Sequence, residues 1–307
     1  MRAVVYDAFG GVEALHVVER PLPKVGPGEV LVEVRSAGVN PVDWKLMSGG
    51  LDALMEFVFP VTPGWDVAGV VSAVGIDVPE YAVGDEVIGY VRKDVVSGGT
   101  YAEYVSAPVR TLARKPASLD WDAAAGLPLA GLTAWQVVRR LGVASGQTVL
   151  IHGGAGGVGQ VGVQLARRAG ARVLATASES NHDLLRALGA EPLVYGDGLV
   201  ERVRALAPEG VDVVADFAGG VLEVTTAVLA PGGSHASIAD SSVTEVGGSW
   251  MWVRPDSADL AQLAGLVDSG DLTIRVAHAF DLADVVDAIR LSQGGHVAGK
   301  IALRVSR

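Results

Sequence analysis

The stretch Thr148-Val149-Leu150-Ile151-His152-Gly153-Gly154-Ala155-Gly156-Gly157-Val158-Gly159 decides the fold of this 307-residue chain. It begins with apolar, mostly β-branched residues, a composition typical of a buried strand. Its second half fits the pattern G-x-G-x-x-G through Gly154, Gly156 and Gly159. In that pattern the glycines permit a tight turn, let the backbone approach a pyrophosphate and let the next helix pack on the sheet. The stretch therefore predicts a strand, a dinucleotide-binding turn and a helix.

The start of this helix gives an electrostatic reason for the same prediction. The first N–H groups of a helix have no acceptor within it, and its dipole places partial positive charge at that end. We therefore expect the backbone N–H groups of Gly157 and Val158 to bind the pyrophosphate.

Strand and helix patterns alternate after this turn. The further predicted strands are residues 172–176, 211–216 and 234–238, and the predicted helices are residues 158–169, 181–188 and 222–229. Such alternation is typical of an α/β fold with a doubly wound parallel sheet, as in the Rossmann fold.

The first hundred or so residues have a different pattern of short strands and turns. Val30–Arg35 alternates apolar with charged residues, and Val67–Val74 is a second valine-rich run. A series of strands without regular helices predicts a distorted barrel. Between residues 120 and 141, Ala and Leu at helical spacing predict two short helices, interrupted at Pro128 and Gly131.

The C-terminal residues predict how the two patterns are joined. Residues 281–291 are expected to form a helix, and residues 300–305 a strand that returns to the barrel. We therefore predict a barrel domain of residues 1–115, completed by 272–307, and a nucleotide-binding domain of residues 116–271.

Composition excludes several classes of partner. The net charge is −11 and no basic block is present, so we expect neither nucleic acid nor an anionic membrane as partner. No segment approaches the about 20 apolar residues of a membrane span. The chain has no cysteine, and its start lacks the layout of a signal peptide. These features predict a cytoplasmic protein without disulfides or thiolate metal sites.

The end of the second predicted strand bears on the choice of cofactor. Sites that prefer NAD place Asp or Glu there, about 20 residues after the turn, to bind the ribose 2′-hydroxyl. In this chain the strand ends in Ala175-Thr176-Ala177-Ser178. Without a carboxylate at this tip, a 2′-phosphate is not repelled, and Ser178 and Asn181 can donate to it. We therefore predict NADPH, unless the side chain of Glu179 turns inward and favours NADH.

Five further stretches accompany the glycine turn from one end of the chain to the other. They are Ala37-Gly38-Val39-Asn40-Pro41-Val42-Asp43, Pro63-Gly64-Trp65-Asp66-Val67-Ala68-Gly69, Gly99-Thr100-Tyr101-Ala102-Glu103-Tyr104, Gly131-Leu132-Thr133-Ala134-Trp135 and Gly299-Lys300. Together they resemble the quinone oxidoreductase (zeta-crystallin-like) branch of the medium-chain dehydrogenases. The resemblance implies a GroES-like barrel, a Rossmann domain with the cofactor in the cleft between them, and a homodimer or homotetramer.

The resemblance also implies roles for single residues. Asn40 and Asp43 are expected near the nicotinamide and the substrate, Thr133 near the carboxamide, and Tyr195 near the adenosine; we add Lys300 to the residues expected at the cofactor. Each has a structural alternative. Asn40 can form a turn, Asp43 can cap a helix, Thr133 can bond to its own helix, and Tyr195 can simply end a strand.

The ends of two more strands offer further cofactor contacts. Phe217-Ala218 and Ile238 follow strands at the carboxyl edge, where open α/β sheets bind ligands. We expect backbone contacts to the ribose and nicotinamide from these residues, with packing as the alternative.

The zinc alcohol dehydrogenases share this fold, so their metal sites are a direct comparison. Zinc in that branch needs Cys and His ligands. The Gly-His-Glu of that branch stands here as Gly64-Trp65-Asp66, and cysteine is absent. We therefore predict no metal.

Without a metal to polarise a ketone, the acceptor should take hydride readily, as a quinone or an α,β-unsaturated carbonyl does. The protein then supplies proximity and a donor for the developing oxyanion. Asn40 and Asp43 are the candidate catalytic residues. Many relatives carry Tyr two residues after this Asp, where this chain has Lys45. Lys45 either donates to the oxyanion or is an ordinary surface lysine, and water is the other possible proton source.

We therefore predict an NADPH-dependent reductase of quinones or enones. The alternatives are an enoyl-thioester reductase, which would need a basic path for a phosphorylated carrier, and an NADPH-binding protein with little turnover. The loop Trp250-Met251-Trp252 is expected either to line an apolar substrate pocket or to cover an oligomer edge.

Overall fold

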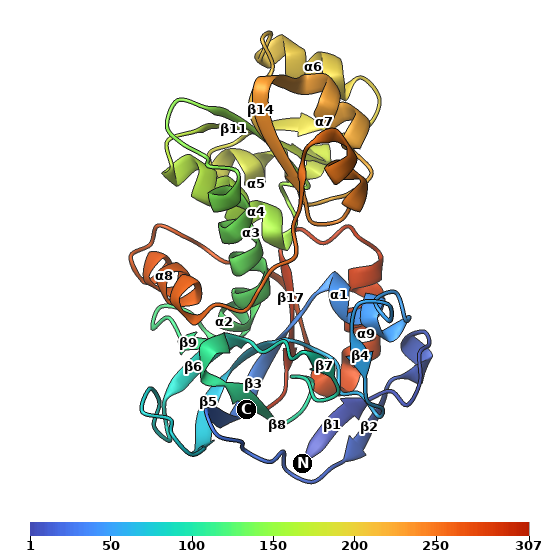
Figure 1. Ribbon diagram of the computed structural model, residues 1–307, viewed down its shortest axis with the longest axis vertical. Helices are drawn as coiled ribbons and strands as arrows, with labels where there is room; N and C mark the ends of the chain where they lie inside the picture. The colour runs from blue at the N-terminus through green and yellow to red at the C-terminus, as the bar shows by residue number, and fades with distance from the viewer. Residues whose placement is uncertain (307) are drawn as a thin grey trace. The chain divides into compact units, whose positions relative to one another are not determined.

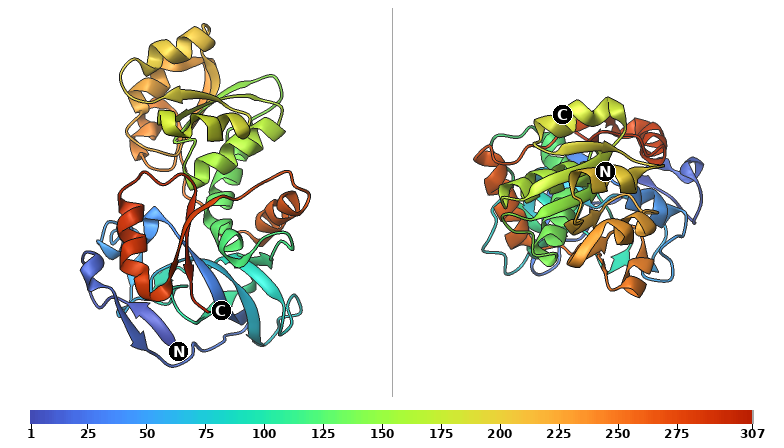
Figure 2. Two further views of the ribbon diagram at one scale, coloured as in Figure 1. Left: turned by 180° about the vertical axis from the view of Figure 1, so that it is seen from behind. Right: turned by 90° about the horizontal axis from the view of Figure 1, so that it is seen from above.

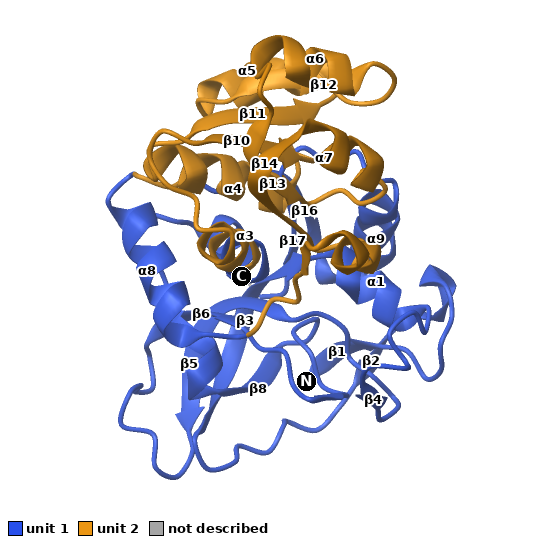
Figure 3. Cartoon of the chain, turned by 45° about the horizontal axis from the view of Figure 1, so that its top comes forward, with its two compact units in different colours: residues 1–132, 255–270, 274–307 blue, residues 133–254, 271–273 orange. Residues whose placement is uncertain are grey.

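The structure is a computed structural model that describes residues 1–306. The chain folds into two compact units, shown in different colours in Figure 3. Unit 1 comprises residues 1–132, 255–270 and 274–307, and unit 2 comprises residues 133–254 and 271–273.

Unit 2 is built on a six-stranded sheet in which every pair of neighbouring strands is parallel (Figure 1). In spatial order the strands are β12 (Glu191–Val194), β11 (Arg172–Ala177), β10 (Thr148–His152), β13 (Val211–Asp216), β14 (Leu229–Ser237) and β15 (Ser249–Trp250). This order confirms the predicted doubly wound sheet, because the chain starts at β10 and builds outward in both directions.

Helices cover both faces of this sheet. They are α3 (Pro128–Arg140), whose first turn belongs to unit 1, α4 (Gly157–Arg168), α5 (His182–Ala187), α6 (Leu199–Leu206) and α7 (Leu222–Val228). Alternate residues of β10 belong to two different hydrophobic cores, one on each face of the sheet. Val149 and Ile151 pack with residues of α3, α4 and α5, whereas Leu150 packs with residues of α6 and α7. Because these strands are buried on both faces, their sequences are continuous apolar runs rather than alternating patterns.

Unit 1 is a barrel-like assembly of mainly antiparallel strands. Its main sheet has the order β16 (Val276–Asp281), β17 (Lys300–Arg304), β3 (Glu29–Val39), β5 (Asp66–Val74), β6 (Glu86–Tyr90) and β9 (Leu112–Arg114), with β8 (Tyr104–Pro108) also paired to β3. Two small pairs join β1 (Arg2–Val5) to β2 (His16–Glu19) and β4 (Glu56–Phe57) to β7 (Val95–Val96). The helices of this unit are α1 (Pro41–Met47), α2 (Trp121–Gly126), α8 (Ser257–Asp268) and α9 (Val285–Gln293).

The C-terminal segment completes unit 1. Strand β17 pairs antiparallel with β3, so that Ile301 lies opposite Val39. In Figure 2 the red C-terminal segment runs beside blue strands of the N-terminal part of the chain. This pairing confirms the predicted return of the last strand to the barrel. It also brings the C-terminal Lys300 close to the N-terminal Asn40.

Helix α1 is the clearest error of the sequence prediction, which expected no regular helix in the first hundred residues. Asn40 and Asp43 form a reciprocal capping box at its start, and Pro41 occupies the first helical position. Both features favour helix initiation. The helix has only seven residues, so a periodicity argument had too few positions to detect it.

Short 3₁₀ helices fill several connections: η1 (Val12–Ala14), η2 (Val109–Thr111), η3 (Glu179–Asn181), η4 (Ser241–Val246) and η5 (Leu282–Asp284). Within residues 1–306, every helix falls short of the length or the apolar character that a bilayer crossing requires.

Candidate functional site

The glycine turn between β10 and α4 has the geometry of a phosphate cradle. Gly153 has a φ of 72°, a conformation that favours glycine. A Cβ atom on Gly159 would lie 2.1 Å from the carbonyl oxygen of Gly153, and one on Gly154 would lie 2.8 Å from the Cβ of Ala175. Side chains at these two positions would therefore force the turn apart. The turn closes tightly only because these positions are glycine.

The helix that follows presents free donors. Gly156 is the N-cap of α4, with no side-chain cap, and the first N–H with an acceptor at that cap is the one of Gln160, which bonds to Gly156. Gly157 and Val158 belong to the first turn, whose N–H groups have no intrahelical acceptor. Both are partly exposed. These free donors at a helix N-terminus are suited to an anionic group such as a pyrophosphate.

The tip of β11 brings the predicted phosphate donors together. The Asn181 amide donates to the Ser178 hydroxyl at 3.0 Å, and this hydroxyl also lies 3.0 Å from that of Ser180. Glu179 is exposed, so its side chain is not held inward. Tyr195, just after β12, is 52% exposed and open to a ligand.

Backbone N–H groups at the ends of β13 and β14, which the sequence offered as cofactor contacts, already donate hydrogen bonds within the protein. The Phe217 N–H donates to the His152 carbonyl, the Ala218 N–H to the Asp216 carboxylate, and the Ile238 N–H to the Asp216 carbonyl. These three N–H groups are already used within the protein, so a cofactor would meet only carbonyls or side chains here. Thr133 is buried in α3.

In unit 1 a buried polar network surrounds Asn40. Its Oδ1 accepts a hydrogen bond from the Lys300 ammonium, and its Nδ2 donates to Asp66 Oδ2 at 2.9 Å. The Lys300 nitrogen also lies 3.9 Å from Asp66 Oδ2, and it donates to the Val39 carbonyl. All three side chains are almost fully buried. Lys300, expected at the cofactor, is thus found bonded to Asn40 within the protein.

Burial shifts the pKa values of the ionisable groups in this network toward their neutral forms. It raises the pKa of Asp66 to about 6, against the opposing effects of Lys300 and of the hydrogen bonds from Asn40 and from the Leu129 N–H. Burial likewise lowers the pKa of Lys300, while Asp66 and Asp43 act in the opposite direction. The two groups thus stabilise each other's charged form in a medium that disfavours both charges.

Asp43 forms the second half of the network. Its Oδ2 accepts hydrogen bonds from the Asn40 N–H at 2.8 Å and from the Tyr101 hydroxyl at 2.7 Å. Its Oδ1 is buried and has no hydrogen-bond partner among residues 1–306. Burial raises the pKa of Asp43 to about 7, although both hydrogen bonds favour its ionised form. The carboxyl group can therefore carry a proton near neutral pH.

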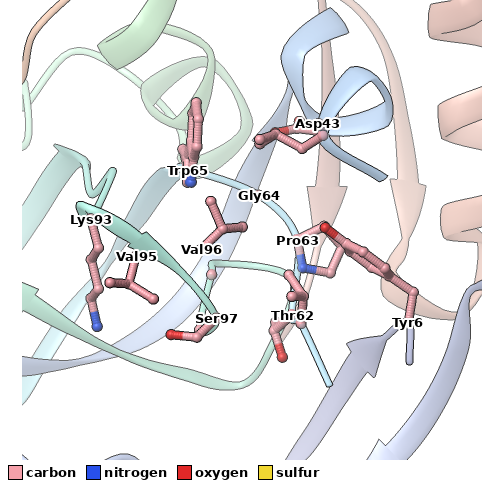
Figure 4. A pocket seen from close by; sticks show the side chains of 14 residues that line it. Tyr6, Asp43, Thr62, Pro63, Gly64, Trp65, Lys93, Val95, Val96 and Ser97 are labelled. Atoms are coloured by element: carbon pink, nitrogen blue, oxygen red, sulfur yellow. The ribbon is translucent and has the colours of Figure 1, made fainter. Parts of the chain in front are cut away.

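Asp43 lines a hollow in unit 1, which Figure 4 shows from close by. The walls come from the segment 61–65, from the segment 93–99 and from Tyr6 and Leu46. Tight packing of Gly64 and Gly99 holds these walls together. A Cβ atom on Gly64 would lie 2.3 Å from the Tyr101 ring, and one on Gly99 would lie 2.4 Å from the Gly64 carbonyl.

Lys45 is not among the residues that line this hollow. It is exposed on α1, with its ammonium 5.6 Å from the centre of the Trp44 ring. Sequence reasoning also missed three members of the site. Asp66 and Tyr101 were named only within the stretches that carry the family resemblance, without a role of their own. No feature of the sequence pointed to Tyr6 as a site residue.

Comparisons with known proteins agree with this geometry. Residues 26–117 match the family model described as "Alcohol dehydrogenase GroES-like domain", and residues 188–303 match the one described as "Zinc-binding dehydrogenase". The chain is 34% identical to an NADPH-dependent alkenal/one oxidoreductase of Arabidopsis thaliana, over 99% of this chain and 79% of the relative. It is 32% identical to the quinone oxidoreductase QR1 of Triphysaria versicolor, over 99% and 98% of the two chains.

A solved structure shows a comparable similarity in fold and sequence. The quinone oxidoreductase from Coxiella burnetii superimposes with a TM-score of 0.89 at 34% identity and covers 100% of this chain and 99% of its own. The chain belongs to the medium-chain dehydrogenase/reductase superfamily, in its quinone oxidoreductase branch. Within residues 1–306, no three His, Cys, Asp or Glu side chains gather as metal ligands would.

Proposed function

We propose that this protein uses NADPH to reduce quinones and α,β-unsaturated carbonyls. The observation that carries the proposal is the presence in one chain of two features: a phosphate-binding glycine turn in unit 2 and a buried, protonatable carboxyl group in unit 1. The relatives named as quinone and alkenal/one oxidoreductases support this substrate class.

NADPH is the cofactor that fits unit 2. The N–H groups of Gly157 and Val158 bind the pyrophosphate, and Ser178 and Asn181 donate to the 2′-phosphate. When bound, the cofactor supplies hydride. The exposed position of Glu179 leaves the phosphate site open. Tyr195 and the segments at Phe217, Ala218 and Ile238 complete our proposed cofactor site, together with Thr133.

The hollow beside Asp43 is the proposed site of the acceptor's carbonyl group. Reduction of an enone or a quinone adds one hydride and one proton, so the protein must also deliver a proton or hold one at the oxygen. Asn40 keeps one N–H after its bond to Asp66, because an amide nitrogen carries two hydrogens. Asn40 is hydrogen-bonded to Asp43 but is not among the residues that line the hollow. Its second N–H is our proposed donor to the oxyanion, in the manner of an oxyanion hole.

Asp43 is our proposed proton donor. Its pKa of about 7 keeps a share of the carboxyl protonated at neutral pH, which suits a general acid. Its unpartnered Oδ1 can carry that proton toward the hollow. Lys45 is instead proposed to be a surface lysine, since it is exposed and packs on Trp44.

We also propose that catalysis requires no zinc. The chain lacks cysteine, and Trp65 stands where the zinc branch has a histidine ligand. The buried ammonium of Lys300 lies beside Asp66 and supplies the positive charge there. Activity should therefore survive treatment with 1,10-phenanthroline, and inhibition that zinc reverses would contradict the proposal.

NADPH oxidation tests the whole proposal. The acceptors are 1,4-benzoquinone, 9,10-phenanthrenequinone, trans-2-hexenal and crotonyl-CoA, each with NADPH and with NADH. We expect turnover with the quinones and the alkenal and a preference for NADPH. Tight NADPH binding without oxidation by any acceptor would refute the enzymatic function and favour a binding role. Turnover with crotonyl-CoA alone would favour an enoyl-thioester reductase.

A homodimer is the proposed assembly, and the cytoplasm the proposed location. Strand β15 is an edge of the parallel sheet, and Trp250 and Trp252 are 44% and 38% exposed there. Exposed aromatic side chains on a sheet edge suit a protein contact. Light scattering of the native chain and of the Trp250→Asp variant tests this, because a monomeric native chain would exclude it.

A further inference from the structure

An aromatic row leads away from the hollow in unit 1. We use this name for Tyr6, Phe59, Phe9 and Phe57, in order of contact. The ring centres are 5.9 Å apart for Tyr6 and Phe59, 5.2 Å for Phe59 and Phe9, and 4.9 Å for Phe9 and Phe57. All three contacts are edge-to-face arrangements at ordinary aromatic contact distances. The four rings therefore form one continuous apolar path.

This path runs from the proposed carbonyl site to the solvent. Tyr6 is fully buried, and its ring lines the hollow on the side opposite Trp65 (Figure 4). Phe59 and Phe9, the two middle rings of the row, are 37% and 39% exposed, so the row opens to solvent along its middle. The path is also tied to the hollow through β4, because Phe57 pairs with Val96, which lines the hollow. Contiguous exposed aromatic surface beside a cavity is typical of a binding site.

We propose that the aromatic row binds the apolar chain of an acceptor whose carbonyl group occupies the hollow. The preferred acceptors are then neutral and lipophilic: alkenals and enones with a long alkyl chain, and quinones with an alkyl or prenyl substituent. This inference rests on the proposed function and specifies its substrate class.

Negative charge near the aromatic row disfavours anionic ligands. The segments that carry the rings also carry Asp7 and Glu56, both exposed, with His16 Nε2 3.4 Å from the Asp7 carboxylate. These carboxylates repel the phosphates of a coenzyme A thioester and the headgroups of an anionic membrane. A neutral chain meets no such repulsion, and it gains from leaving water.

The test is the dependence of kcat/KM on chain length, measured with NADPH and trans-2-butenal, trans-2-hexenal and trans-2-octenal. In the native protein we expect a rise of about two- to fourfold for each added methylene group. The Phe59→Ser and Phe9→Ser variants should lose most of this rise, and Phe59→Leu should keep most of it. Ile76→Ser is the matched control, since Ile76 is 76% exposed in the same unit and lies outside the row; it should keep both activity and slope.

The possible outcomes distinguish a failure of this inference from a failure of the proposed function. Turnover of the alkenals with a flat native slope, or a slope unchanged in Phe59→Ser, overturns the aromatic row as a substrate site. No turnover with any alkenal or quinone overturns the proposed function and this inference with it. Binding to phosphatidylcholine vesicles that Phe59→Ser abolishes, combined with a flat slope, would show that the row contacts a membrane instead.

Discussion

Replacing Asp43 by Asn tests the electrostatic state of the site most directly. The amide oxygen that this substitution introduces can still accept the hydrogen bonds from the Asn40 N–H and the Tyr101 hydroxyl. The substitution therefore removes the ionisable group with little change in shape. Any effect that depends on pH then comes from the charge.

The expected magnitude follows from linkage. In the unfolded chain Asp43 loses its proton near pH 4, whereas in the folded protein it keeps the proton until about pH 7. Between these values the folded state binds the extra proton, so the free energy of unfolding falls by about 1.4 kcal/mol for each pH unit as the pH rises. The whole window amounts to about 4 kcal/mol, because the group is completely buried.

Urea unfolding at several pH values measures this slope. The sequence pI is about 5.0, so a range from about pH 5.5 to 8 avoids precipitation and should capture about 2 kcal/mol of the effect. Relative to the native protein, Asp43→Asn should therefore gain about 2 kcal/mol in the free energy of unfolding as the pH rises across this range. Asp52→Asn, at an exposed position, is the control and should follow the native curve. Parallel curves for the native protein and Asp43→Asn would refute the raised pKa.

The same variant bears on catalysis. If Asp43 donates the proton, native kcat/KM should fall above about pH 7, where the carboxyl group ionises, and Asp43→Asn should lose about 10²-fold or more in kcat. A variant with native kcat and the native pH profile would transfer the proton-donor role to water.

Three further predictions concern the cofactor and the buried network. Gly159→Ala should weaken NADPH binding at least about tenfold in a fluorescence titration, because its methyl group would collide with the turn; Gly265→Ala, in open space, should bind normally. Lys300→Met should cost about 3 kcal/mol or more in urea unfolding by leaving the Asp66 carboxylate unpaired, and addition of Asp66→Asn should recover much of the loss. Ser178→Asp should raise the KM for NADPH more than the KM for NADH, and equal effects on both would place the 2′-phosphate elsewhere.

The parts of the fold that the sequence predicted well are those set by local pattern. The glycine turn, the strand before it and the helix after it lie close together along the chain, and the periodicity switches at the glycines. The return of β17 to the barrel was also predicted correctly. By contrast, helix α1 depends on a capping box and a proline rather than on periodicity. The prediction considered a helix cap at Asp43 but no regular helix in this region.

The site in unit 1 was harder to predict, because its contacts join distant residues. Lys300 and Asn40 are 260 positions apart, and Tyr101 and Asp43 are 58 apart. No local pattern reports such contacts. At β13 the sequence showed a strand end suited to a ligand, but not that Asp216 already uses the Ala218 N–H.

The ion pair in the network has a consequence for Asn40. A buried ion pair seldom adds net stability, since the desolvation of both charges offsets their attraction. This pair does, however, fix the orientation of an amide group. Lys300 can only donate to Asn40, and the Asp66 carboxylate can only accept from it. Rotation of the amide by half a turn would place two donors together on one side and two acceptors on the other. The amide nitrogen is therefore held on the Asp66 side, and its second N–H has a fixed direction before any substrate arrives. Such preorganisation is what the proposed oxyanion site requires. If Asn40 has that role, the pair serves the reaction even though it adds little to the free energy of unfolding.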